Sequence, residues 1–204
     1  MGKSRIVAGS LGAVALALAG AFPWFRPSNV QEGLPPWLVE DLRTDHAGET
    51  GAVWIYHGVL AVATDPKLRE FAEHHRDTES KHLTIIEGLL DYPGRSKLLP
   101  VWRVAGFLTG ALPALLGPAA VYRTIDSVET YVDYHYQYQV DRLQNMTQFE
   151  DLRATLMACQ ADEVEHRDQA RDAGGPGREE TAPRVWDEIV RVGSMTAIGI
   201  ARVI

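Results

Sequence analysis

The chain has 204 residues, of which 46% are hydrophobic and 23% charged, and this composition is typical of one globular domain with a substantial core. The formal net charge of -7, from 20 basic and 27 acidic residues, argues against a nucleic-acid partner, because phosphate binding relies on clustered lysine and arginine. Cys159 is the only cysteine. An intrachain disulfide and a thiolate zinc cluster are therefore excluded, and any metal must be held by oxygen and imidazole ligands.

Residues 1–25 form a segment that we expect to be directed to a membrane. After Lys3 and Arg5, residues 6–25 carry no charge and are mostly apolar. Three interpretations stay open: a spanning helix, an interfacial anchor and a cleavable signal peptide. The early Pro23 favours a membrane anchor over a cleaved signal peptide. The basic residues Lys3 and Arg5 favour a cytoplasmic location of the N-terminus. An anchor lying in the interface would keep the domain at the cytoplasmic face of a bacterial inner membrane, where we expect it.

The rest of the chain reads as a linker followed by one helical domain. Residues 26–36 contain proline, glycine and polar residues that cannot sustain a helix, so the folded domain is expected at 37–204. No strand-like alternation competes with the helical pattern, and the sequence predicts an all-α fold. The predicted helices cover approximately residues 37–63, 66–90, 98–117, 118–146, 148–172 and 183–203.

The predicted helix at 98–117 is unusually apolar. Arg103 is its only charged residue and Pro113 interrupts it late. The apolar length before Pro113 is short for a membrane span, so insertion into the membrane interface is favoured. A buried core helix or a dimer face is the alternative.

Two Glu-x-x-His pairs lie inside predicted helices: Glu79 with His82, and Glu163 with His166. Side chains three residues apart stand one turn apart on the same helix face, so each pair can converge on one metal ion. A single pair of this kind is more often an exposed surface contact than a ligand pair. The interpretation therefore depends on what accompanies the pairs.

Each pair follows a helix that carries a lone glutamate, Glu49 before the first pair and Glu129 before the second. The lone glutamate precedes the paired one by 30 residues in the first case and by 34 in the second, a spacing that suits a helical hairpin. Lone glutamates from two helices with Glu-x-x-His from two others are the ligand set of carboxylate-bridged di-iron and di-manganese bundles. The sequence thus predicts a ferritin-like up-and-down four-helix bundle, with an additional apolar helical segment and a C-terminal helix. The predicted metal ligands are Glu49, Glu79, His82, Glu129, Glu163 and His166.

The chemistry of a buried metal pair explains this choice of residues. Four carboxylates neutralise two divalent ions in an environment of low dielectric constant, and two of them can bridge the ions. Two neutral imidazoles suit iron and leave each ion an open position for dioxygen. Zinc could occupy such a site but could not do redox work. We therefore expect two iron ions that activate dioxygen.

The segment from Asp45 to Ala52, DHAGETGA, resembles the signature of the demethoxyubiquinone hydroxylase family of ubiquinone biosynthesis. The similarity extends from about Trp37 to the C-terminus. Further matching positions are Ile55, Tyr56, Gly58, Glu79, His82, Leu83, the apolar segment from Leu99 to Gly117, Val128, Glu129, His135, Tyr136 and the run from Glu163 to His166.

The resemblance implies a di-iron monooxygenase that hydroxylates the quinone ring of a 3-demethoxyubiquinol-like intermediate with dioxygen and electrons from NADH. It carries over the six ligands individually, and it places His135 and Tyr136 around the metals or in the electron path. A hydrogen-bonded core histidine is an equal alternative for His135. Implied partners are a polyprenyl quinone, dioxygen, a membrane lipid surface and other proteins of ubiquinone biosynthesis.

Two further functions stay open at this level. A rubrerythrin-like peroxide scavenger or an iron-binding protein would use the same ligands, and a membrane-attached bundle without metal would use none of them. The apolar segments favour the quinone hydroxylase, because a lipid-embedded helix beside the metals would let a prenylated quinone enter without exposing its tail to water.

Overall fold

The computed structural model describes residues 33–174 and 184–204, so the predicted segment 1–25 and most of the linker lie outside the described residues. The described residues contain no strand, which confirms the all-α prediction. Each predicted helix is present within a few residues of its expected bounds. The helices are α2 (Pro36–Val62), α3 (Pro66–Leu89), α4 (Leu99–Leu116), α5 (Pro118–Leu143), α6 (Glu150–Gly174) and α8 (Arg184–Ala201), with short 3-10 helices at Tyr92–Gly94 and Thr147–Phe149.

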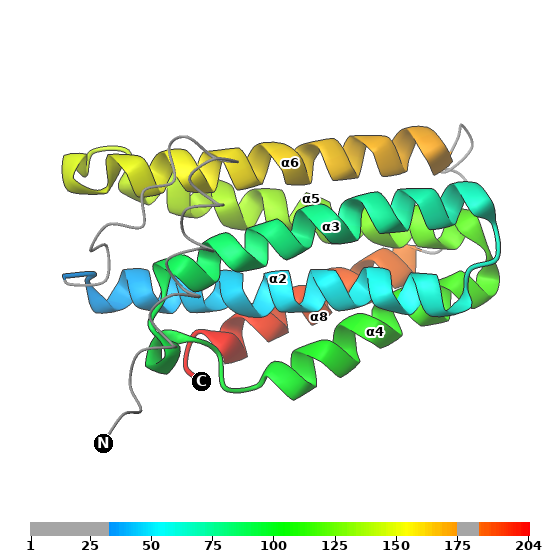
Figure 1. The fold of residues 1–204 in the computed structure, drawn as a ribbon, viewed down its shortest axis with the longest axis horizontal. Coiled ribbons are helices and arrows are strands. Elements are labelled where there is room, and N and C mark those ends of the chain that lie inside the picture. The colour runs from blue at the N-terminus through cyan, green and yellow to red at the C-terminus, as the bar shows by residue number, and fades with distance from the viewer. Residues whose placement is uncertain (1–32, 175–183) are drawn as a thin grey trace, which may run out of the picture.

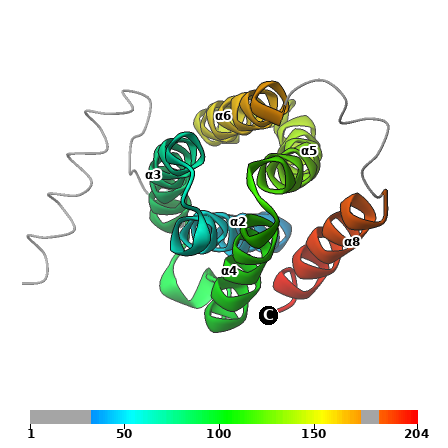
Figure 2. The same ribbon diagram turned by 90° about the vertical axis from the view of Figure 1, so that its right-hand side faces the viewer.

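Viewed along their axes, α2, α3, α6 and α5 form a ring, while α4 and α8 lie outside it (Figure 2). The helices α2 and α3 form one hairpin and α5 and α6 another (Figure 1). Between the hairpins, α4 carries the chain back along the bundle, so that α3 and α5 run in the same direction. The ring is the predicted ferritin-like four-helix bundle, and α4 and α8 are the predicted additional helices. The helices do not simply alternate up and down as predicted, because the long connection through α4 leaves α3 and α5 parallel.

Proline and glycine set the helix boundaries. Pro66 and Pro118 occupy the first helical positions of α3 and α5, where the missing N–H costs nothing. The Asp65 carboxylate accepts a hydrogen bond of 2.8 Å from the Leu68 N–H and caps α3, as its sequence position predicts. Gly117 joins α4 to α5 with a φ of +104°, a conformation that glycine adopts without steric cost.

The ring contains two apolar clusters, one toward each end of the bundle. One cluster includes Leu38, Leu42, Ile86 and Leu156, and the other includes Val59, Leu68, Ala72 and Ile125. On each helix of the ring, the predicted metal ligands lie between the residues of one cluster and those of the other. Cys159 belongs to the first cluster, where burial raises the pKa of its thiol, so it is a core residue.

Close backbone contact joins α4 to α2. A Cβ atom added to Gly110 would lie 1.9 Å from the Ile55 carbonyl oxygen, and one added to Gly106 would lie 2.2 Å from the Gly51 carbonyl oxygen. From the α2 side, a Cβ atom on Gly58 would lie 2.1 Å from a backbone oxygen of α4. Glycine is required at these positions because any side chain would push the two helices apart.

The other face of α4 is apolar and exposed. Among the described residues, α4 is the one helix long and apolar enough to cross a membrane, and 33% of that stretch is buried; core helices of soluble proteins meet the same criterion. The exposed side chains are Val101, Val104, Leu108, Leu112, Leu115 and Leu116.

Polar contacts at both ends hold α8 against the ring. At its N-terminal end the Asp187 carboxylate accepts hydrogen bonds from Arg123 (2.8 Å) and Ser127 (2.9 Å). At its C-terminal end Arg202 donates to the buried Asp41 carboxylate at 2.7 Å, and Arg142 donates to the other oxygen at the same distance. These contacts hold α8 against the ring at both of its ends.

Candidate metal centre

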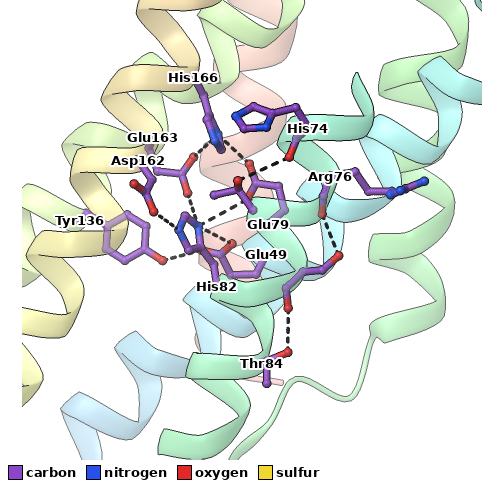
Figure 3. Close-up of polar contacts among 12 residues, drawn as sticks. Glu49, His74, Arg76, Glu79, His82, Thr84, Tyr136, Asp162, Glu163 and His166 are labelled. Atoms are coloured by element: carbon purple, nitrogen blue, oxygen red, sulfur yellow. Dashed lines mark hydrogen bonds and ion pairs between the residues drawn. The ribbon is translucent and has the colours of Figure 1, made fainter. Parts of the chain in front are cut away.

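The six predicted ligands lie together in the middle of the ring, and all of them except Glu129 are labelled in Figure 3. They come from four helices: Glu49 from α2, Glu79 and His82 from α3, Glu129 from α5, and Glu163 and His166 from α6. None of the six is more than 4% exposed. Surface charges would not collect in this way, so the exposed-contact interpretation of the Glu-x-x-His pairs does not hold.

The six residues form two groups, in each of which the ligand atoms lie within 4.8 Å of one another. The first group is Glu49, Glu79, His82 and Glu163, and the second is Glu79, Glu129, Glu163 and His166. Glu79 and Glu163 belong to both groups. Each group supplies three carboxylates and one imidazole, which is the donor set for two ions bridged by two shared carboxylates.

Both imidazoles turn the same nitrogen toward the shared carboxylates. His82 Nδ1 lies 2.9 Å from Glu163 Oε1 and 3.7 Å from Glu79 Oε2. His166 Nδ1 lies 3.0 Å from Glu79 Oε1 and 3.2 Å from Glu163 Oε2. These nitrogens are therefore the atoms available to metal ions.

Several buried atoms of the centre make no hydrogen bond of good geometry among the described residues, although some of them lie at ion-pair distance from one another: Glu49 Oε2, both Glu79 carboxylate oxygens, Glu129 Oε1, Glu163 Oε2 and His166 Nδ1. Burying carboxylate oxygens without well-aligned donors costs free energy, so the folded chain is incomplete at this point. Metal cations would satisfy these atoms together, and the residues present fit a pair of divalent ions.

Without metal, the centre holds protons. Burial raises the pKa of Glu49 and of Glu129 well above the usual range. Burial acts to lower the pKa of His166, but the adjacent Glu163 and Glu79 carboxylates outweigh it and raise the pKa to about 11. The pKa of His82 is raised in the same way, against burial, by Asp162, Glu163 and Glu79. Metal binding must displace these protons.

Tyr136 and His135 lie beside the centre on α5. The Tyr136 hydroxyl donates to Glu49 Oε1, so it orients one predicted ligand directly. His135 Nε2 lies 3.0 Å from Asp45 Oδ1, and the Gln139 amide donates to the same oxygen at 2.6 Å. His135 is therefore a hydrogen-bonded histidine that also lines the cavity described below.

Three further residues of the site were missed in the sequence. Asp162 Oδ2 lies 2.9 Å from His82 Nε2 and fixes that ring, but the pair joins two helices and has no local signature. His75 precedes Glu79 by four residues, and Tyr56 follows Glu49 by seven. Both spacings place the residue on the ligand face of its helix, and this signal could have found them. The Tyr56 hydroxyl is buried without a partner in the described chain, and burial followed by the Glu129 charge raises its pKa.

An apolar cavity of about 320 Å³ opens onto the carboxylates. Glu49, Glu79, Glu129 and Glu163 form its floor, and its walls come from α2, α4, α5 and α8. This volume lies in the range of small-molecule sites. The apolar wall residues include Ile55, Trp102, Val128, Val132, Val190 and Ile198.

The chain is similar in sequence to known proteins over most of its length. Residues 37–201 match the family described as ubiquinone biosynthesis protein COQ7. The chain is 37% identical over 163 residues to a 3-demethoxyubiquinol 3-hydroxylase of Rhodospirillum rubrum, covering 78% of this chain and 75% of that protein. It is 34% identical over 182 residues to a mitochondrial NADPH-dependent 3-demethoxyubiquinone 3-hydroxylase of Dictyostelium discoideum, covering 84% and 80%. It is 31% identical over 159 residues to a mitochondrial 5-demethoxyubiquinone hydroxylase of Saccharomyces cerevisiae, covering 70% and 68%.

Proposed function

The chain belongs to the COQ7 family of ubiquinone biosynthesis proteins, and we propose that it is a 3-demethoxyubiquinol 3-hydroxylase with a di-iron centre. The enzyme adds a hydroxyl group to the quinone ring of a demethoxyubiquinone-like intermediate. One observation carries this proposal: the apolar cavity and the metal centre are adjacent, because four buried carboxylates of the two-ion ligand set form the floor of the cavity. A ring bound in the cavity would rest against the metals.

The residues of the chain hold and orient this site. The Tyr136 hydroxyl fixes Glu49 and Asp162 fixes His82, both ligands of the first group, so that these donors keep their positions when substrate binds. The cavity walls exclude water and bind the apolar ring and the start of its prenyl tail. The iron ions, when bound, supply the redox centre at which dioxygen is activated.

We assign the electrons to a nicotinamide nucleotide. The resemblance in sequence predicts NADH, whereas the relative from Dictyostelium discoideum is named NADPH-dependent. His135 lines the cavity beside Tyr136 and lies within the Asp45 hydrogen-bond network, and we place it on the path of electrons or protons to the quinone. Comparing NADH with NADPH in one assay decides the donor.

The exposed face of α4 supports a membrane surface as the place of action. Its leucine and valine side chains face outward, while other residues of α4, including Trp102 and Ala105, line the cavity. A lipid surface at this face would cover the apolar residues and give a prenylated quinone an apolar path inward. The cytoplasmic face of a bacterial inner membrane and contacts with other biosynthetic proteins stay predictions.

The test measures metal and product together. The purified full chain should bind two iron ions and, with dioxygen and a nicotinamide reductant, add one oxygen atom to a short-chain demethoxyubiquinol, as detected by mass spectrometry. Glu163→Ala should remove product formation while the helical circular dichroism persists. Turnover in that variant, or peroxide consumption without any dependence on quinone, would reject the proposal.

A further inference from the structure

A second pocket reaches the metal centre from the opposite side of the ring. It has a volume of about 290 Å³ and lies between α3 and α6. The imidazoles of His82 and His166 line it. Its other walls are polar, and they include His74, His75, Thr78, Asp162, Glu165 and Gln169. The centre thus has an apolar side, where carboxylates face a cavity, and a polar side, where imidazoles face a pocket.

His75 is the unexplained residue of this pocket. Its side chain is fully buried, yet neither ring nitrogen makes a hydrogen bond of good geometry among the described residues. Burial lowers its pKa, and the Gln169 side chain lies near enough to oppose that shift slightly. Its ring stands edge-on to that of His166, with the ring centroids 4.2 Å apart. A buried imidazole without a partner costs free energy, and a phenylalanine of similar shape would avoid that cost. The ring nitrogens of His75 therefore suit a ligand that enters the pocket.

We propose that the polar pocket is the entry site for the divalent metal ion, which His75 binds in passing between solvent and the metal centre. This inference rests on the proposed metal centre and adds the route by which it fills. Imidazole nitrogens and the carboxylates of Asp162 and Glu165 are the donors that a first-row divalent ion accepts as it loses water. The residues Glu79, Glu129, Glu163 and His166 then receive the ion.

The apolar cavity is a poor route for the same ion. A hydrated divalent ion would have to shed water there mostly against apolar side chains such as Ile55, Trp102 and Val128, while Asp45 and His135 of the lining already pair with each other. In the polar pocket, the ion can keep bound water and contact polar side chains until it reaches the imidazoles of His82 and His166. A volume of about 290 Å³ holds several waters. The metal ion and the quinone would therefore enter the protein by different routes.

Charge also directs the ion into this pocket. Asp162 and Glu165 carry negative charge along the path, and Lys81 is the one basic lysine or arginine side chain in the lining. In the empty centre, protons held by the ligands offset the buried carboxylates, so the attraction comes from Asp162 and Glu165 in the pocket.

Uptake of cobalt(II) by the metal-free full chain tests the route, because its absorption reports binding without turnover. His75→Phe keeps the ring shape and removes both nitrogens, and Glu165→Gln removes one charge. We expect His75→Phe to slow uptake by about tenfold or more and Glu165→Gln to slow it a few fold, because lost steering and lost donors both lower the entry rate. The final content should stay at two cobalt ions.

Two controls define the comparison. His57→Phe removes an exposed histidine of α2 that lines neither pocket, and Ala105→Trp places a large side chain at the lining of the apolar cavity; both variants should take up cobalt at the wild-type rate. Wild-type uptake rates in both His75→Phe and Glu165→Gln, or uptake slowed by Ala105→Trp as much as by His75→Phe, would overturn the entry route. Absence of cobalt binding in the wild-type chain would instead reject the metal centre itself, so the two failures are distinguishable.

Discussion

The ring of α2, α3, α5 and α6 differs from the two helices outside it in what holds the helices together. The ring buries ionisable ligands between two apolar clusters, and their poorly satisfied polar atoms oppose folding until a cation is bound. By contrast, α4 is held by backbone contact at glycines, and α8 by ion pairs at its ends. The difference teaches that substitutions in the ligand set should change function more than stability, and substitutions at the α4 contact the reverse.

The shared ligands give the largest expected effect. Glu79→Ala removes a carboxylate of both metal groups, so it should lower metal content from two ions to none and abolish hydroxylation. Glu49→Ala removes a carboxylate of one group only and should leave one ion. Elemental analysis after gentle purification measures both contents. Equal metal content in the two variants would contradict the bridging role.

The glycine contact should give the largest loss of stability. Gly110→Ala places a Cβ atom 1.9 Å from the Ile55 carbonyl oxygen, and we expect a loss of about 3 kcal/mol in the free energy of unfolding because α4 must shift. The matched control is Gly199→Ala on α8, where a Cβ atom meets nothing within 4 Å. That variant should gain up to about 1 kcal/mol, since alanine favours helix over glycine. Urea unfolding of metal-free protein compares them, and equal stability would contradict the close contact.

The metal affinity should depend on pH, because the groups that hold protons are ligands of the ring and none of them belongs to the outer helices. In the metal-free chain the raised pKa values of His166 (about 11), His82, Glu49 and Glu129 keep protons on these groups at neutral pH. Metal must displace them, so affinity should rise with pH, by about tenfold per unit for each proton released. Titration calorimetry in buffers of different ionisation enthalpy counts the protons. An affinity that is independent of pH would show that the centre is already deprotonated.

The contacts at the ends of α8 should give the smallest effect. Asp187→Ala removes the acceptor of Arg123 and Ser127, and because its side chain is partly exposed we expect a loss of about 1 kcal/mol. The helix should then open more often over the cavity, raising KM for the quinone and speeding amide exchange in α8 while metal content stays unchanged. Glu188→Ala is the control, because Glu188 pairs with Arg191 of the same helix. A raised KM in the control alone would contradict the clamp.

The sequence by itself determined the helices and the ligands. Proline and glycine mark the boundaries at Pro66, Gly117 and Pro118, and their effect on the backbone is local. Spacing of three residues places Glu79 with His82, and Glu163 with His166, on one helix face, and the bundle precedent adds the two lone glutamates. Local geometry decides these features, so they could be predicted.

Only the tertiary structure decided which ligands are shared, what fixes His82, and which faces open to solvent. The sharing of Glu79 and Glu163, the contact of Asp162 with His82 and the burial of His75 against His166 all join different helices. Such contacts depend on the rotation and depth of each helix in the ring. Packing of the whole chain, including the close approach of α4 and the placement of α8, sets those quantities, and no local spacing records them.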